Sequence, residues 1–111
     1  MNKDPLVYLG HVKESIILIE SYLDGKTKKD FQNDTELQDA VIRRLAIIGE
    51  AAKNLPEEFT KKNPEIPWGE LARLRDKVVH GYFGIDLELV YTSVKEQLPS
   101  LKKQVNLLLE K

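Results

Sequence analysis

Large apolar residues recur every three or four positions along almost the whole of this 111-residue chain, and this periodicity constrains the fold more than any other feature. Residues at that spacing share one face of an α-helix, whereas a strand needs strict alternation, of which the sequence holds no useful length. The sequence therefore predicts an all-α protein, an antiparallel bundle of four to five helices. At this length the helices are expected to form a single domain, residues 1–111.

Four apolar stripes mark the long helices, and local signals mark several of their starts. Asp4 followed by Pro5 is typical of a helix start, and Asp86 is a second candidate N-cap. Thr35 and Gln38 predict a capping box. The stripes are Leu9, Val12, Ile16, Ile19 and Leu23; Leu37, Val41, Leu45, Ile48, Ala52 and Leu55; Leu71, Leu74 and Val78; and Val90, Val94, Leu98, Leu101, Val105 and Leu108.

The remaining segments predict shorter or less regular structure. Residues 26–33 are polar and indicate a plain connection, whereas residues 57–62 indicate a helical turn. Pro67 can open the third helix, and Trp68 beside it is expected to be a buried anchor. Pro99 falls inside the last stripe, so we expect a kink or two abutting helices there.

The second helix has apolar residues on a further side, which adds Ala40, Ile47 and Ala51 to its main stripe. Two apolar sides predict a helix with two neighbours, and the second neighbour can belong to this chain or to another protomer. Glu50 lies among small residues of the same helix, which indicates a buried carboxylate that pairs with an arginine.

Composition excludes several classes of protein. The chain has no cysteine, which excludes a disulfide scaffold, a zinc knuckle and a thiol nucleophile, and fits a reducing cytosol. The longest apolar run, residues 16–19, is far too short to span a bilayer, and the first five residues hold no apolar signal core. We therefore expect a cytoplasmic protein with no membrane partner.

The charge balance limits how the chain can bind nucleic acid. It has 17 Lys and Arg against 18 Asp and Glu, for a net charge of −1. Proteins that hold nucleic acid tightly by bulk electrostatics are usually much more basic. Any contact with RNA or DNA is therefore expected to be local and transient.

The segment from Arg75 to Tyr82 concentrates chemistry at the end of the third predicted helix. The imidazole of His80 can move protons near neutral pH, the guanidinium of Arg75 can clamp a phosphate, and the hydroxyl of Tyr82 can be modified. Asp76 lies four residues before His80, so its carboxylate can orient the imidazole. Arg75 and His80 are five residues apart, about 140° around a regular helix, and converge poorly in one copy.

Two copies of the motif that face each other across a two-fold axis would place two imidazoles and two guanidiniums in one cleft. That set suits RNA cleavage, because RNA carries its own nucleophile, the 2′-hydroxyl. The histidines would serve as general base and general acid, and the arginines would stabilise the phosphorane charge. This chemistry needs no metal or other cofactor.

A structural interpretation competes with the catalytic one. A histidine at a helix C-terminus interacts favourably with the helix dipole, and an arginine nearby often pairs with a carboxylate. In that case Arg75 and His80 would serve folding or assembly, and Tyr82 would pack in the core or in a loop.

Four blocks of sequence resemble the HepT-type branch of the HEPN family: Ile48–Lys53, Pro67–Trp68, Leu74–Tyr82 and Ile85–Asp86. The similarity covers nearly the whole chain, including its length and helix order. The short motif in this helical frame, with these flanking blocks, is fairly specific.

The resemblance implies a helical bundle that forms a homodimer with its Arg–His motifs at the interface. It implies a metal-independent endoribonuclease that is the toxin of a type VII-like toxin–antitoxin pair. It also implies an antitoxin, a minimal nucleotidyltransferase, that neutralises the toxin by transferring AMP to the motif tyrosine. Carried over, Arg75 and His80 are the catalytic pair, Tyr82 is the modification site and Asp76 has a supporting role.

The motif departs from the family pattern at one position, since many HEPN motifs have a polar residue, often Asn, where this chain has Asp76. A carboxylate there can tune His80 but also repels RNA phosphate. A second function therefore stays open: a non-catalytic helical subunit that docks on a minimal nucleotidyltransferase and helps to present nucleotide or substrate.

Overall fold

The computed structural model describes residues 4–80 and 86–110, apart from the side chains of Arg75 and of residues 78–80. Within these ranges the chain forms six α-helices and no strand. The helices are α1 (Pro5–Leu23), α2 (Lys28–Gln32), α3 (Thr35–Asn54), α4 (Glu57–Lys62), α5 (Trp68–His80) and α6 (Leu87–Leu109). The all-α prediction is confirmed, with two short helices added to the four long ones.

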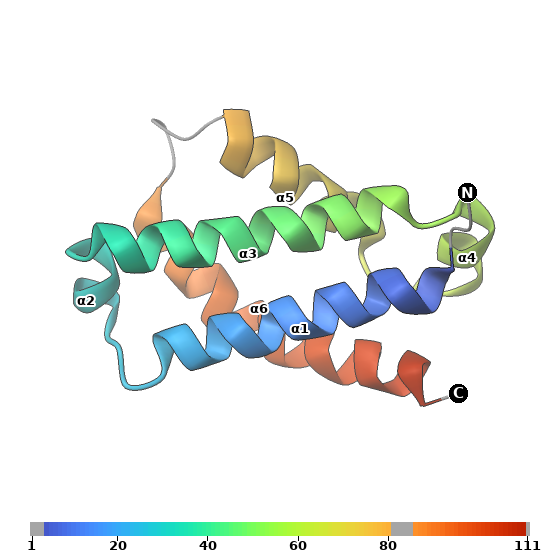
Figure 1. The fold of residues 1–111 in the computed structure, drawn as a ribbon, viewed down its shortest axis with the longest axis horizontal. Coiled ribbons are helices and arrows are strands. Elements are labelled where there is room, and N and C mark those ends of the chain that lie inside the picture. Colours follow the sequence, from blue (N-terminus) through green and yellow to red (C-terminus); the bar gives the residue numbers. More distant parts are fainter. Residues whose placement is uncertain (1–3, 81–85, 111) are drawn as a thin grey trace.

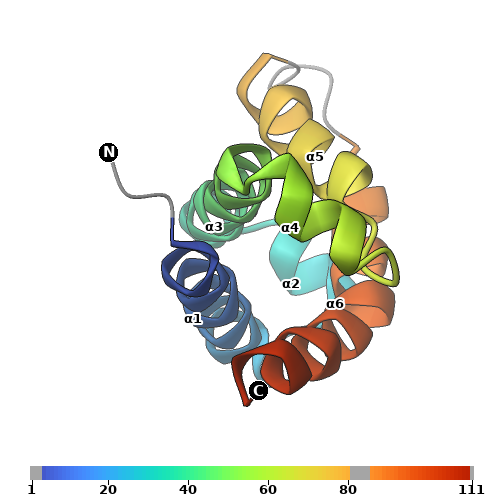
Figure 2. The same cartoon turned by 90° about the vertical axis from the view of Figure 1, so that its right-hand side faces the viewer.

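The four long helices form an elongated antiparallel bundle (Figure 1). Helix α3 lies between α1 and α5 and packs on both of them, and α6 crosses behind α1. Seen end-on, the long helices surround a common core, with α2 and α4 near opposite ends of the bundle (Figure 2). The chain thus winds up and down through neighbouring helices, as short connections require.

The core consists of the predicted stripes. In α1 the residues Leu9, Val12, Ile16, Ile19 and Leu23 are all buried, and in α6 the same holds for Val94, Leu98, Leu101, Val105 and Leu108. Each buried leucine or isoleucine stabilises the fold by about 1.5–3 kcal/mol relative to an exposed one. The 3–4 spacing therefore predicted which side of each helix faces inward.

Helix α3 confirms the prediction of two neighbours, and both belong to the same chain. Its buried residues include Val41 and Ile48, which are fully enclosed, and also Ala51 and Ala52, which lie side by side at the end toward Asn54. On the further apolar side of α3, Ala51 is buried, whereas Ala40 and Ile47 are half-buried. Glu50 is exposed, so the expectation of a buried carboxylate at this position is wrong.

Helix α2 was missed, because residues 26–33 were expected to be a plain connection. A capping box starts the helix: the Thr27 side chain accepts a hydrogen bond from the Asp30 backbone, and the Asp30 carboxylate accepts one from the Thr27 backbone at 2.9 Å. These bonds from Thr27 lower the pKa of the Asp30 carboxyl below its ordinary value. A single apolar residue, Phe31, is fully buried and fixes the helix to the bundle.

Helix α2 closes one end of the bundle and fixes the start of α6. The rings of Phe31 and Tyr91 lie 5.9 Å apart, and the Tyr91 hydroxyl donates a hydrogen bond to the Lys26 carbonyl at 2.7 Å. Lys28 and Glu88 form an exposed ion pair at 3.3 Å. A segment that is polar in sequence therefore positions the helix that follows the motif.

The starts of three long helices follow local rules. Asp4 and Asp86 cap α1 and α6 as predicted, and accept hydrogen bonds from backbone N–H groups two and three residues later. The predicted Thr35–Gln38 capping box is wrong, because Asp34 caps α3 instead and the Gln38 side chain donates to the Phe31 and Gln32 carbonyls. An aspartate one residue earlier competes successfully, since its carboxylate is the stronger acceptor.

Two prolines behave differently. Pro67 precedes α5, and its carbonyl accepts a hydrogen bond from the Leu71 backbone, so the predicted opening is confirmed. Pro99 lies within the single helix α6, which excludes two abutting helices. No helix in the described part of the chain is long and apolar enough to cross a membrane.

A buried hydroxyl provides a test of the core. Ser15 is fully buried on α1, and its Oγ has no hydrogen-bond partner among the described residues. An unsatisfied buried polar group costs about 1–3 kcal/mol, and alanine is also a better helix former than serine. We therefore expect Ser15→Ala to raise the free energy of unfolding by about 1 kcal/mol and the melting temperature by roughly 4 °C.

Thermal unfolding followed by circular dichroism measures this change. Ser21→Ala is the matched control, because Ser21 lies on the same helix but is exposed. It gains helix propensity alone and is expected to shift the melting temperature less. A Ser15→Ala protein that melts below the wild type would show that the hydroxyl is satisfied in solution.

Candidate functional site

Helix α5 carries the Arg–His motif. Arg75 and Asp76 lie in its second half, and His80 is its last residue. Tyr82, the predicted modification site, lies outside the described residues. Arg75 and His80 lie on one unbroken helix, Trp68–His80. Their α-carbon positions are therefore about 140° apart around the helix axis, as the sequence predicts.

The start of α5 is anchored by the aromatic residue that the sequence marks as buried. Trp68 is 8% exposed, and its indole N–H donates a hydrogen bond to the Asn63 carbonyl at 2.8 Å. Phe59 of α4 packs at 6.0 Å from the same ring. Together with the packing of α5 along α3, these contacts fix the axis on which the motif lies.

The described surroundings of the motif are rich in charge. Asp76 is exposed on α5, and the exposed cations Arg73 and Lys77 lie on the same helix. On the neighbouring helix α3, Arg43 is exposed and Arg44 is half-buried. Cations and carboxylates therefore alternate along the described part of α5, and α3 beside it adds two further cations.

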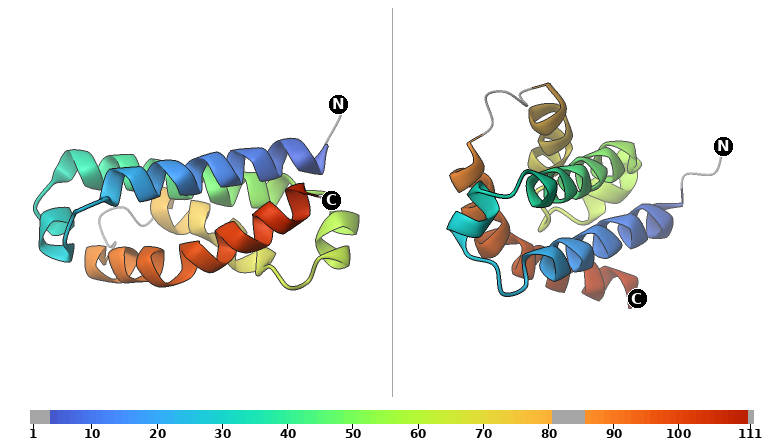
Figure 3. Two further views of the ribbon diagram at one scale, coloured as in Figure 1. Left: turned by 90° about the horizontal axis from the view of Figure 1, so that it is seen from below. Right: turned by 60° about the vertical axis from the view of Figure 1, so that its left-hand side comes forward.

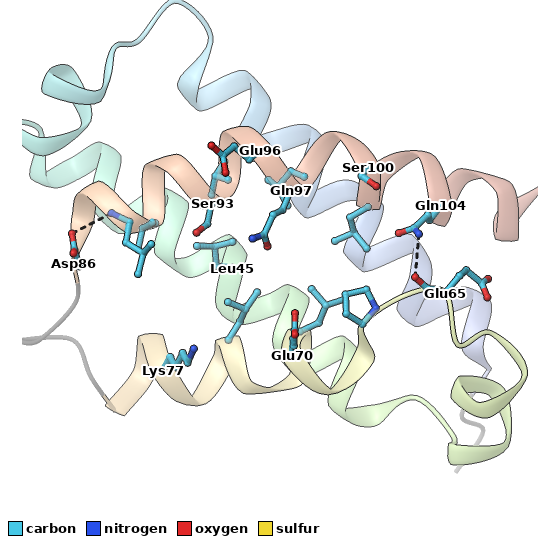
Figure 4. Close-up of a pocket in the computed structure, with 18 residues that line it drawn as sticks. Leu45, Glu65, Glu70, Lys77, Asp86, Ser93, Glu96, Gln97, Ser100 and Gln104 are labelled. Carbon is cyan, nitrogen blue, oxygen red and sulfur yellow. Dashed lines mark hydrogen bonds between the residues drawn. The ribbon is translucent and has the colours of Figure 1, made fainter.

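A groove of about 990 Å³ runs between α5 and α6 (Figure 4). Its floor includes Leu45 of α3, and its walls include Leu74 of α5 and Leu89 of α6. The groove exists because α5 packs on α3 whereas α6 packs on α1 and α2, so the two helices diverge. In the right-hand view of Figure 3, α3 lies between α5 and α1.

Four described residues of α5 line the groove. Glu70, Leu74 and Lys77 follow the spacing of four and three that defines one helix face, and Leu71 lies beside them. Leu71 precedes Arg75 by four residues, so the Arg75 position lies on the side of α5 that Leu71 occupies. Asp76, whose side chain is described, does not line the groove.

The sequence singled out one acidic residue of this groove, Asp86, as a helix cap, and did not group it with the others. Glu65, Glu70, Asp86 and Glu96 line it, although they come from four separate places in the chain. No motif joins them, and only the packing of α5 and α6 brings them to one opening. Among the described residues no cluster of three acidic or histidine side chains could hold a metal ion.

The architecture and the motif define a class of protein. It is a small all-α bundle in which an arginine and a histidine, separated by four residues, lie at the end of the fifth helix. The pattern of the family described as "Ribonuclease HepT-like" matches residues 12–108. The chain therefore belongs to this family, a HepT-type branch of HEPN proteins, and the family supports a nuclease-type activity.

Three relatives illustrate the similarity. A probable ribonuclease HepT of Thermococcus cleftensis is 50% identical over 95 residues, which cover 86% of each chain. A protein of Methanocaldococcus jannaschii, named as a gamma-glutamylcyclotransferase and candidate RNase, is 51% identical over 110 residues, 99% of this chain. A candidate RNase of Caldanaerobacter subterraneus is 39% identical over 109 residues, 98% of this chain and 97% of its own.

The chain spans 50% of the length of the Methanocaldococcus jannaschii relative. It spans most of the length of the other two relatives. No solved structure matches the chain.

Proposed function

We propose that this chain is a metal-independent endoribonuclease, the toxin of a type VII-like toxin–antitoxin pair. The observation that carries the proposal is the position of the motif in a chain of the ribonuclease HepT-like family: α5 ends at His80, and Arg75 lies on the same helix. The C-terminal end of an α-helix favours a positive charge, so a histidine there is suited to hold the proton that a general acid donates.

The proposed reaction uses two motifs in a homodimer. One histidine removes the proton of a 2′-hydroxyl, and that oxygen attacks the adjacent phosphorus. The second histidine donates a proton to the departing 5′-oxygen, and the arginines stabilise the negative charge of the phosphorane. The bond between phosphorus and the 5′-oxygen breaks, which leaves a 2′,3′-cyclic phosphate and a 5′-hydroxyl.

A homodimer, or a higher assembly of dimers, follows from the spacing of the motif, since Arg75 and His80 of one copy diverge by about 140°.

The proposed control is transfer of AMP to Tyr82 by a minimal nucleotidyltransferase. Tyr82 follows His80 by two residues, so an AMP group on its hydroxyl would bring a negative phosphate close to the motif. That phosphate would attract Arg75 and repel the incoming RNA strand.

Cleavage is expected to persist in EDTA and to depend on the motif. His80→Ala should lower the rate by roughly 10²–10⁴-fold if His80 is a general acid or base, and Arg75→Ala should cost about 10²–10³-fold. The measurement is the rate of cleavage of a mixed RNA, with the product ends mapped for 2′,3′-cyclic phosphate.

His11→Ala is the matched control, because His11 is exposed and lies outside the motif. Loss of all activity in EDTA would contradict the mechanism. Motif variants that cleave at the wild-type rate would instead favour the second function, a non-catalytic subunit that docks on a nucleotidyltransferase.

The dimer is tested by analytical ultracentrifugation of the wild type at micromolar concentration. The expected sedimentation is that of two chains or of a multiple of two. A protein that cleaves RNA through His80 as a strict monomer would exclude the two-motif cleft.

Tyr82→Phe should keep much of the cleavage activity, because the hydroxyl takes no part in the proposed proton transfers. It should also escape modification by the partner. Co-expression with a minimal nucleotidyltransferase followed by intact-mass analysis measures this, with Tyr22→Phe as the control tyrosine on α1. Addition of AMP that persists in Tyr82→Phe would remove Tyr82 from the mechanism.

A further inference from the structure

The groove between α5 and α6 leaves apolar surface open that the chain itself does not cover. Leu89 on its α6 wall is 62% exposed, and Leu74 and Val90 are half-buried beside it. Its floor continues directly into the core through Leu71, Leu98 and Leu101. An apolar opening of this size in an otherwise charged surface is typical of a binding site for another molecule.

Both ends of the groove are held in place. At one end the Gln104 side chain of α6 donates a hydrogen bond to the Glu65 carbonyl, just before α5, at 3.1 Å (Figure 4). At the other end Tyr91 of α6 bonds to the Lys26 carbonyl beside α2 at 2.7 Å. The first bond joins two residues that line the groove, and the second holds α6 from outside it.

The rim of the groove is acidic. The described residues that line it include four carboxylates, Glu65, Glu70, Asp86 and Glu96, against the ammonium group of Lys77. The carboxylates of Glu70 and Glu96 come from facing walls (Figure 4). A molecule with apolar groups in the middle and positive charges at its margins complements this arrangement.

The shape of the groove suits a helix. The lining residues of α6 run from Asp86 to Gln104, which is about 27 Å of helix at 1.5 Å per residue. Ser93, Gln97 and Ser100 form an uncharged polar row along this wall, beside the apolar floor. An amphipathic helix recognises such a groove through apolar residues on one face.

We propose that this groove binds an amphipathic helical segment of a protein partner, apolar on one face and basic along its margins. The segment would lie between α5 and α6, along the lining residues of both helices. The proposal does not depend on the ribonuclease activity.

RNA and a second copy of this chain fit the groove less well. The acidic rim repels RNA phosphates. Two facing copies of the groove would bring like charges together. A basic partner satisfies both the apolar floor and the rim.

A charge-swap experiment tests the proposal. The probe is a fluorescent helical peptide of about 18 residues with leucines on one face and lysines at the margins of that face. A second peptide keeps the leucines and replaces the lysines by glutamates. We expect the lysine peptide to bind the wild type at least about tenfold more tightly, with a preference that weakens at high salt.

The double variant Glu70→Lys with Glu96→Lys should reverse the preference, so that the glutamate peptide binds more tightly. Leu89→Ser should weaken both peptides by about tenfold without unfolding the protein, because Leu89 is already exposed. The controls lie outside the groove: Leu107→Ser, which is 55% exposed on the same helix, and Glu14→Lys with Glu110→Lys.

Several results would overturn the proposal. These are equal binding of the two peptides, no binding of the lysine peptide up to about 1 mM, or equal losses in the controls. Dissociation of a wild-type dimer by Leu89→Ser alone would make the groove an interface between copies. RNA cleavage altered by the groove variants beyond the controls would assign it to RNA. Peptide binding is measured without RNA, so failure of the ribonuclease proposal leaves this test intact.

Discussion

The burial of α3 between α1 and α5 is the contact on which the rest of the structure depends. Val41 and Ile48 of α3 are fully enclosed, and α3 packs on α1 and on α5. Helix α5 packs mainly on α3, whereas α6 packs on α1 and α2. The direction of α5 and the position of the groove beside it both follow from which helices pack on each other.

The same packing leaves one side of α5 beside an open groove. The described lining of this groove is apolar at its floor and carries four carboxylates, Glu65, Glu70, Asp86 and Glu96. The groove therefore gathers negative charge on a small bundle whose net charge is only −1.

Local sequence signals correctly predicted those features of the fold, such as helix starts, that depend on a single residue. Asp4 and Asp86 cap their helices because a carboxylate satisfies free backbone N–H groups regardless of the surroundings. Helix α2 was missed because its stability comes from one buried ring, Phe31, whose partner Tyr91 lies sixty residues away. Pattern reasoning failed at Glu50 for a related reason, since small neighbours do not reveal which side of α3 is covered.

The sequence by itself determined the helical class, the inward side of each long helix and the place of Arg75 and His80 on one helix, because periodicity and spacing are properties of neighbouring residues. Family membership also follows from the sequence alone. Only the tertiary structure decided that α3 meets both neighbours within one chain and that α5 and α6 diverge. It also joined Glu65, Glu70, Asp86 and Glu96 around one opening, because such proximity arises from helix packing between residues distant in sequence.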